Sequence, residues 1–278
     1  MPGTLYVVAT PIGNLEDVSL RALRILREVS LIAAEDTRRT GRLLQHYSIS
    51  TRTTSLHAHN EHEKAPRLVA ELLSGASVAL VSDAGTPLIS DPGLALVRAA
   101  RREGIRVEAI PGPSAVMTLL SVAGFTDREF CFFGFPPNRS NERKTWLERL
   151  ARQEATAVFF EAPHRIERTI GDLTKIVTAG RVIAIGRELT KAYEEVVVCP
   201  IEQAFDRLGS IKGEFTVALA PDTPQKTVEA QVSDERLASE IGHEIQNGAL
   251  SKRAAVKRVA DRYGMAVNDV YKLLNRDR

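Results

Sequence analysis

The sequence has few of the features that mark secreted or membrane proteins. Its 278 residues include only two cysteines, Cys131 and Cys199, and we interpret both as buried free thiols because each lies in an apolar, strand-like run. No apolar run approaches the ~18 residues of a membrane-spanning helix. The N-terminal residues lack the basic and apolar regions of a secretory signal. These absences predict a cytosolic protein without a membrane partner.

Charge is nearly balanced overall but unevenly distributed. The net charge is +2, yet residues 251–278 contain eight Lys or Arg and three Asp, which leaves the first 250 residues slightly acidic. The 44% hydrophobic and 26% charged content is ordinary for a globular protein that buries a sizeable core. A basic appendage on a slightly acidic body indicates a polyanionic partner.

The first part of the chain alternates between short apolar runs and amphipathic segments. Runs typical of buried strands are 5–9, 29–34, 78–82 and 107–110. Segments with helical periodicity are 17–28, 37–46, 60–73 and 92–103. This alternation predicts a mainly parallel sheet covered by helices. A short helix is expected over 113–123, after Pro111-Gly112-Pro113.

Strand-like runs are denser in the second part of the chain. They are 130–135, 157–160, 182–185, 196–199 and 215–220, and helical patterns are expected at 141–153, 164–177 and 201–208. This part predicts a second α/β domain with a mixed sheet. A Pro-punctuated linker follows at 221–226.

Three helical patterns end the chain, at 234–247, 251–262 and 266–275. Ser251 is a candidate N-cap, and the short turn around Gly264 is typical of a helix-turn-helix-like module. We therefore expect two α/β domains, 1–118 and 119–222, and a helical module at 234–278.

Three Gly- and Pro-rich turns each follow a predicted strand. They are Thr10-Pro-Ile-Gly-Asn-Leu-Glu-Asp17, Ser82-Asp-Ala-Gly-Thr-Pro87 and Pro111-Gly-Pro-Ser-Ala115. Ligands of open α/β sheets bind where strands end, and small side chains there let the main chain approach a ligand closely. The first turn lacks both G-x-G-x-x-G and the Lys-Ser/Thr of a P-loop, which excludes those dinucleotide and nucleoside triphosphate sites. The pattern favours an enzyme or cofactor binder.

Together with Glu161-Ala-Pro-His-Arg165 and Gly213-Glu-Phe-Thr-Val217, these turns resemble the tetrapyrrole methylase family of S-adenosylmethionine-dependent enzymes. Ala34-Glu-Asp-Thr-Arg38 and Ile89-Ser-Asp-Pro-Gly93 are similar to one branch of that family, which methylates a cytidine ribose 2′-hydroxyl in 16S rRNA. The resemblance covers about residues 4–220 for the family and the whole chain for that branch. It implies a homodimer in which two α/β domains hold S-adenosylmethionine in a cleft.

The resemblance implies a cofactor site built from both domains. Asp83, Gly85 and Thr86 offer polar groups at a strand end. Ser114 and Ala115 open a helix whose free N–H groups suit a carboxylate. Further cofactor-binding candidates are Ile12 from the first turn and, by resemblance, Ala162, Leu189, Gly213 and Phe215. A turn or capping role for Asp83, and core positions for Ile12 and Phe215, are the alternatives.

The candidate catalytic residues are Glu35, Asp36, Arg38 and His57. Asp36 can simply cap the next helix. In the functional alternative, Arg38 binds a phosphate while Asp36 or Glu35 orients or deprotonates a hydroxyl. The segment 57–62 holds three histidines, but zinc needs three or four converging ligands and methyl transfer from a sulfonium needs no metal. We expect no metal site; a surface turn or a nucleotide-contacting loop remain the alternatives there.

Five basic residues are candidates for substrate binding. Arg165 opens a helix, where a cation is poorly placed unless an anion lies nearby, and Lys191 follows another strand. Lys252, Arg253 and Arg258 recur at helical spacing in the C-terminal module. Such clustering predicts RNA docking through phosphates, with a solvated helix face as the alternative.

Two other functions stay open: a tetrapyrrole C-methyltransferase and a non-catalytic RNA-binding module. The porphyrinoid-modifying members tend to have a Gly-rich first loop and Gly-Asp-Pro in the second. Here Pro11 and Asn14 occupy the first loop and Ser82-Asp83-Ala84 the second, which argues against a macrocyclic substrate. We therefore expect a ribose methyltransferase that acts on 16S rRNA or the small ribosomal subunit.

Overall fold

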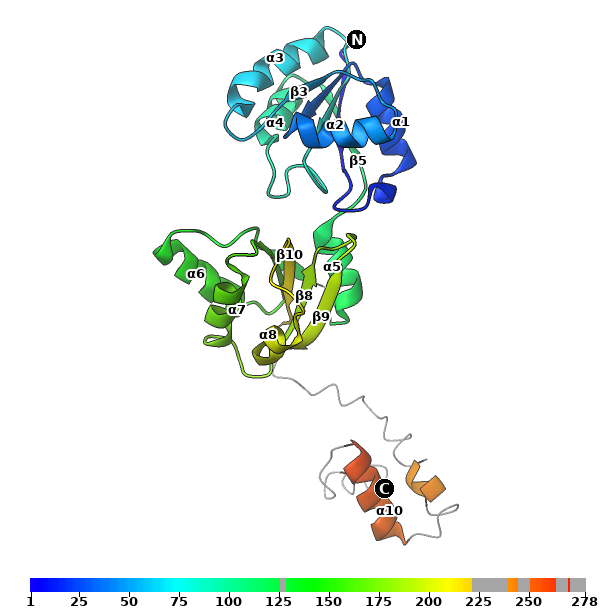
Figure 1. The fold of residues 1–278 in the computed structure, drawn as a ribbon, viewed down its shortest axis with the longest axis vertical. Coiled ribbons are helices and arrows are strands. Elements are labelled where there is room, and N and C mark those ends of the chain that lie inside the picture. The colour runs from blue at the N-terminus through cyan, green and yellow to red at the C-terminus, as the bar shows by residue number, and fades with distance from the viewer. Residues whose placement is uncertain (126–128, 222–239, 245–250, 264–269, 271–278) are drawn as a thin grey trace. The chain divides into compact units, whose positions relative to one another are not determined.

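The computed structural model describes residues 1–125, 129–221, 240–244, 251–263 and 270. The chain divides into two compact units, Met1–Asp222 and Thr223–Arg278. Within the described ranges the first unit contains two five-stranded sheets with flanking helices (Figure 1). The expected α/β class is confirmed. None of the described helices has the length and apolar composition needed to cross a membrane.

The first sheet is entirely parallel and has the strand order β3-β2-β4-β1-β5. Its strands are β1 (Thr4–Val8), β2 (Leu31–Ala34), β3 (Thr53–Ser55), β4 (Val78–Val81) and β5 (Arg106–Ile110). The sequence pattern predicted four of them. It missed β3 because this edge strand is three residues of Thr and Ser, with no apolar run to mark it.

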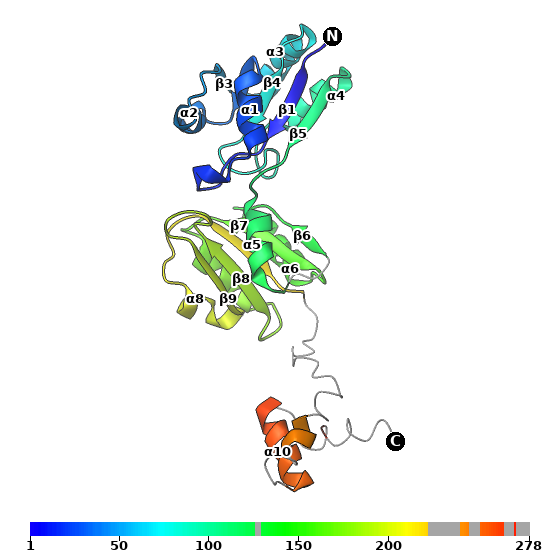
Figure 2. The same ribbon diagram turned by 90° about the vertical axis from the view of Figure 1, so that its right-hand side faces the viewer.

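Helices cover both faces of this sheet. Side chains alternate between faces along a strand, so Leu31 and Ala33 pack with α3 (Glu61–Leu73) and α4 (Leu94–Arg102). Ile32 and Ala34 pack on the opposite face with α1 (Leu20–Glu28) and α2 (Thr37–His46). Figures 1 and 2 show these two helical layers. Double coverage explains why β2 and β4 are buried at every position and uniformly apolar.

The second sheet is mixed, as the sequence predicted, with the order β6-β7-β10-β8-β9. Its strands are β6 (Phe130–Phe132), β7 (Thr156–Glu161), β8 (Val182–Arg187), β9 (Glu195–Pro200) and β10 (Phe215–Leu219). Only the β6–β7 pair is parallel among these neighbours. Cys199 is buried in this sheet, but the expected burial of Cys131 is wrong, since it lies exposed in the edge strand β6.

The second sheet is also covered on both faces. α6 (Ser140–Ala151), α7 (Ile166–Thr174) and the short η2 (Ile201–Gln203) and α8 (Ala204–Arg207) contribute to one apolar cluster. α5 (Ala115–Ala123) packs on the other face through Val116 and Leu119. The third turn thus leaves the first sheet and enters a helix of the second. The division at 118/119 stays a prediction.

In the C-terminal unit the structure describes α10 (Lys252–Tyr263). The Ser251 hydroxyl accepts a hydrogen bond from the Ala254 amide at 3.4 Å, so the expected capping contact is present. Ala255, Val256, Val259 and Ala260 are buried, while Arg253, Lys257 and Arg258 are exposed. Residues 240–244 of the first expected helix are helical. The expected helix at 266–275 lies outside the described residues except for Val270.

Candidate functional site

The three Gly- and Pro-rich turns meet at one edge of the first sheet. They follow β1, β4 and β5, which are adjacent in the order β4-β1-β5. Thr10 and Gly85 exchange two main-chain hydrogen bonds, both of 2.9 Å. The Thr86 hydroxyl donates to the Pro113 carbonyl at 3.3 Å. Gly85 has a φ of +76°, a left-handed conformation that favours glycine. The turns therefore form one hydrogen-bonded wall.

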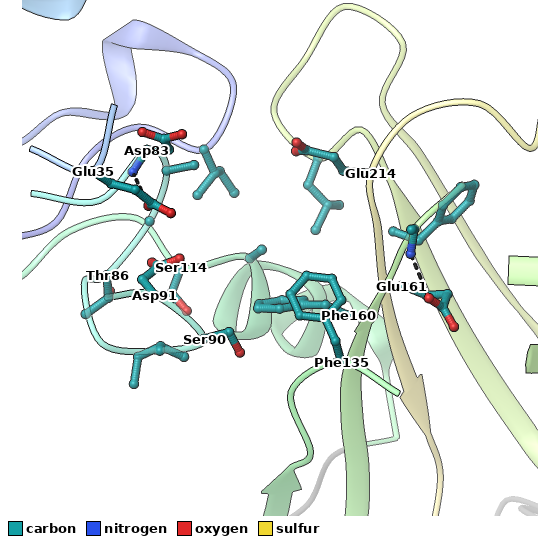
Figure 3. Close-up of a pocket in the computed structure, with 18 of the residues that line it drawn as sticks. Glu35, Asp83, Thr86, Ser90, Asp91, Ser114, Phe135, Phe160, Glu161 and Glu214 are labelled. Atoms are coloured by element: carbon teal, nitrogen blue, oxygen red, sulfur yellow. Dashed lines mark hydrogen bonds between the residues drawn. The ribbon is translucent and has the colours of Figure 1, made fainter. Parts of the chain in front are cut away.

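A cavity of about 420 Å³ opens beside this wall, within the size range of small-molecule sites. Residues from the turns of the first sheet line one side, and residues from β7, β10 and the loops of the second sheet line the other. In Figure 3, Glu35, Asp83 and Asp91 lie across the opening from Phe135, Phe160 and Glu161. The lining includes five carboxylates and one guanidinium, that of Arg39. The cavity therefore favours a cationic ligand.

Glu35 and Asp83 are held together at the ends of β2 and β4. The Asp83 amide donates to Glu35 Oε2 at 3.2 Å, and the Asp36 amide donates to Asp83 Oδ1 at 2.9 Å. The Arg39 guanidinium lies 3.5 Å from Asp83 Oδ2. Burial raises the pKa of Glu35, and the Asp83 charge adds to this, although the Asp83 amide opposes it. Glu35 is therefore more basic than an exposed glutamate.

Asp91 lies in a conformationally restrained loop between β4 and α4. Burial raises its pKa to about 6, and the charges of Glu35 and Asp83 act in the same direction, while a hydrogen bond with Ser82 opposes them. Leu88 and Ser90 have left-handed φ values of 75° and 71°. Non-glycine residues adopt this region at a cost, and such strain gathers at functional sites.

The loop around Asp91 is also anchored at its end. Glu61 Oε2 accepts hydrogen bonds from the amides of Gly93 and Ala95 at 2.8 and 3.3 Å. Because Gly93 is the N-cap of α4, the start of that helix is tied to α3. The Thr10–Gly85 hydrogen bonds hold the start of this loop and Glu61 holds its end, so the loop that carries Asp91 is fixed at both ends.

The opposite wall combines aromatic rings with a buried carboxylate. The Phe135 and Phe160 rings are tilted against each other with centroids 5.4 Å apart. The Glu161 side chain is fully buried and accepts hydrogen bonds from the Ala162 amide at 2.8 Å and from the Thr169 hydroxyl. Because its two oxygens accept these hydrogen bonds within the protein, Glu161 has a structural role in this wall.

Most of the cofactor-binding candidates line this cavity. They are Ile12, Asp83, Gly85, Thr86, Ser114, Ala115, Ala162, Leu189 and Phe215. The Ser114 hydroxyl caps α5 by accepting from the Met117 amide at 3.5 Å. Gly213 does not line the cavity, but it has a φ of +100°, and a Cβ there would lie 2.4 Å from Glu188 Cγ. It shapes the turn that presents Glu214 to the cavity.

Of the catalytic candidates, only Glu35 lines the cavity. Asp36 caps α2 by accepting from the Arg38 amide at 2.8 Å, and the Arg38 guanidinium lies 2.7 Å from the same carboxylate. The hydrogen bond from the Arg38 side chain lowers the pKa of Asp36 far below its ordinary value. Asp36 is therefore a weak proton acceptor.

His57 lies in the loop after β3 and does not line the cavity. Its ring Nε2 is 3.1 Å from the Asn60 amide nitrogen, and its buried Nδ1 has no hydrogen-bond partner in the part of the chain that the structure describes. Among the described residues, no three His, Cys, Asp or Glu side chains are grouped as metal ligands would be.

The basic candidates have different surroundings. The Arg165 Nε lies 3.3 Å from Glu161, and its other nitrogens donate to Asn138 and the Pro136 carbonyl, so Glu161 is the anion at this helix start. Lys191 pairs with Glu188 at 2.8 Å and Glu214 at 3.0 Å.

The C-terminal candidates belong to the other unit. Arg253 and Arg258 are exposed on α10, and Arg258 lies 3.5 Å from Glu244. The side chain of Lys252 lies outside the described residues.

Several lining residues were not among the candidates predicted from the sequence, namely Arg39, Ser90, Asp91, Phe135, Phe160, Glu161 and Glu214. The motif Ile89-Ser-Asp-Pro-Gly93 contained a signal for Asp91, since it places a carboxylate in a Pro/Gly turn after a buried strand. Phe160 had none, because its strand is otherwise core and only the end of β7 reaches the cavity.

Comparison with known proteins agrees with this architecture. A family model described as tetrapyrrole (corrin/porphyrin) methylases matches residues 4–204. A relative from Halalkalibacterium halodurans named ribosomal RNA small subunit methyltransferase I is 43% identical, over 99% of this chain and 96% of the relative. A protein of the same name from Xylella fastidiosa is 54% identical over 70% of this chain and 72% of its own.

Solved structures share the fold. Uroporphyrin-III C-methyl transferase from Thermus thermophilus, complexed with S-adenosylhomocysteine, superposes with a TM-score of 0.55 at 18% identity, covering 78% of this chain and 97% of its own.

Proposed function

Because this chain belongs to the tetrapyrrole methylase family, we propose that it is an S-adenosylmethionine-dependent methyltransferase of small-subunit rRNA. The observation that carries this proposal is the end-to-end similarity to relatives named for that activity. Within the family, the departures in the first and second turns argue against a porphyrinoid substrate. The acceptor that we propose is a cytidine ribose 2′-hydroxyl of 16S rRNA.

The residues of the cavity fit the cofactor. When bound, S-adenosylmethionine supplies a methyl group already activated by a positively charged sulfur. Glu35, Asp83 and Asp91 provide the negative charge that favours such a cation. Phe135 and Phe160 offer an apolar wall that suits a flat purine base. Ser114, at the N-terminus of α5, lies where main-chain N–H groups favour a carboxylate.

Positioning accounts for most of the proposed catalysis, but the hydroxyl must also lose its proton. Glu35 and Asp91 are the best-placed acceptors, because both line the cavity and burial raises the pKa of each. The low pKa of Asp36 leaves it the role of holding Arg38. Arg38 is paired with Asp36 at 2.7 Å, but its side chain is 88% exposed and can be reached by an RNA phosphate.

The remaining assignments follow from this function. We propose that the exposed basic face of α10, which includes Arg253 and Arg258, docks the rRNA through its phosphates. A homodimer and a cytosolic location are the assembly and compartment that we expect for such an enzyme.

The test is methyl transfer from radiolabelled cofactor by the full-length protein. With 16S rRNA from cells lacking the protein, label should enter the RNA and, after nuclease digestion, co-migrate with 2′-O-methylcytidine. Label on uroporphyrinogen instead would identify a tetrapyrrole methyltransferase. Saturable rRNA binding without any transfer would identify a non-catalytic RNA-binding protein, and either outcome would refute the proposal.

A further inference from the structure

A second cavity, of about 390 Å³, adjoins the first. It is lined by the start of the first turn, by Ser82 and by side chains of α2, including Arg42. Arg39, Asp83 and Glu214 line both cavities. The second cavity is therefore next to the first, and these shared residues mark the junction between the two.

The two cavities differ in charge. Five carboxylates and one guanidinium line the first. Arg165 pairs with Glu161 and Lys191 with Glu214, but Glu35, Asp83 and Asp91 still outnumber Arg39 there. In the second, Arg39, Arg42 and Lys191 outnumber Asp83 and Glu214. Opposite charge in adjoining spaces indicates ligand groups of opposite sign. A cation fits the first cavity, and an anion fits the second.

The cations of the second cavity are not equally available to a ligand. Lys191 is neutralised by Glu188 and Glu214 at 2.8 and 3.0 Å. Among the residues that the structure describes, Arg39 forms one ion pair, with Asp83 at 3.5 Å, and its side chain is 61% exposed. Arg42 is exposed, and its guanidinium has no ion pair or hydrogen bond with any residue that the structure describes. Arg42, supported by Arg39, is thus the cation left for an incoming anion.

We propose that the second cavity binds the RNA strand next to the nucleotide being methylated, with Arg42 and Arg39 contacting a flanking phosphate. This inference rests on the rRNA methyltransferase function proposed above. Pro11, Leu15 and Leu43 supply apolar surface for a sugar or a base. An unstacked nucleotide bound here places its ribose at the junction, where the acidic cavity begins.

The experiment compares the full-length wild type with Arg42→Ala and a matched control, Arg101→Ala. Arg101 is an exposed arginine of α4 that lines neither cavity. Binding of in vitro transcribed 16S rRNA is measured by filter retention from low to high salt, and S-adenosylhomocysteine binding is measured by calorimetry.

We expect Arg42→Ala to weaken rRNA binding about tenfold at low salt and to reduce the slope of log affinity against log salt by about 0.7, the value for one lost single-strand phosphate contact. The KM for rRNA should rise while kcat and S-adenosylhomocysteine affinity stay near wild type. Arg101→Ala should match the wild type.

Wild-type rRNA affinity and salt dependence in Arg42→Ala would overturn this inference while leaving the proposed function intact. An equal loss in Arg101→Ala would also overturn it, because the effect would then be one of general surface charge. If the wild-type protein neither binds nor methylates rRNA, the proposed function fails first and this inference fails with it.

Discussion

Asp91 offers the sharpest test of the acidic cavity, because its charge can be switched by pH. Burial raises its pKa to about 6. A carboxyl with that pKa is roughly nine-tenths ionised at pH 7 and roughly one-tenth ionised at pH 5. If the ionised form binds the sulfonium, cofactor affinity should fall about tenfold between these pH values. Asp91→Asn should remove most of this dependence and bind weakly throughout.

Calorimetry with S-adenosylmethionine between pH 5 and 7.5 measures the effect. S-adenosylhomocysteine lacks the positive sulfur, so its affinity should vary less with pH. Glu35, Asp83, Glu161, Glu214 and Arg39 line the same cavity, and the comparison with Asp91→Asn separates Asp91 from them. The matched control is Asp206→Asn in α8, an exposed aspartate that lines neither cavity.

Stability provides a second readout for the same variant. The pKa of Asp91 is raised from its ordinary value of 3.8 to about 6 in the folded protein, so its ionisation disfavours folding as pH rises between those values. Without cofactor, Asp91→Asn should therefore melt no lower than the wild type at pH 7. A flat wild-type affinity profile, or the same profile in Asp91→Asn, would refute the reasoning.

Three further predictions test the surrounding framework. Thr169→Val removes a hydrogen-bond donor from the buried Glu161 carboxylate and should lower the free energy of unfolding, measured in urea, by about 2 kcal/mol. An unchanged free energy of unfolding would contradict this. Gly93 has a φ of +114°, and Gly93→Ala adds a Cβ 2.6 Å from Leu80 Cδ2. This variant should lower the free energy of unfolding by about 3 kcal/mol in the same urea measurement. An unchanged urea midpoint would be the contrary result. Deleting 223–278 should lower rRNA affinity in filter binding but leave S-adenosylhomocysteine affinity intact; unchanged rRNA affinity would argue against a docking role.

The sequence predicted the fold well where local pattern and burial agree. The apolar run at 78–82 and the amphipathic segment at 37–46 correspond to β4 and α2, because a doubly covered sheet requires such runs and its helices require one apolar face. β3 was not predicted because it is a short edge strand. The exposure of Cys131 was not predicted for a similar reason, since the edge strand β6 of the mixed sheet is only partly covered.

The site could be predicted only in part. The three turns identified the wall of the cavity, because strand ends and glycines are visible in sequence. The pairing of Arg165 with Glu161, four residues earlier and fully buried, could not be anticipated, since burial and side-chain direction are set by packing. The different positions of the Arg38 and Arg39 side chains could not be anticipated for the same reason. Both follow Asp36, but only Arg39 faces the cavities.

The restraint on the loop from Ala84 to Gly93 has a consequence for the speed of ligand capture. Thr10 holds its beginning, Glu61 holds its end, and Leu88 and Ser90 keep left-handed conformations between them. A preorganised rim loses little configurational entropy when a ligand arrives. The loop is already ordered in the folded protein. We therefore expect the association rate to be set by diffusion and electrostatic attraction and not by a slow rearrangement of this loop.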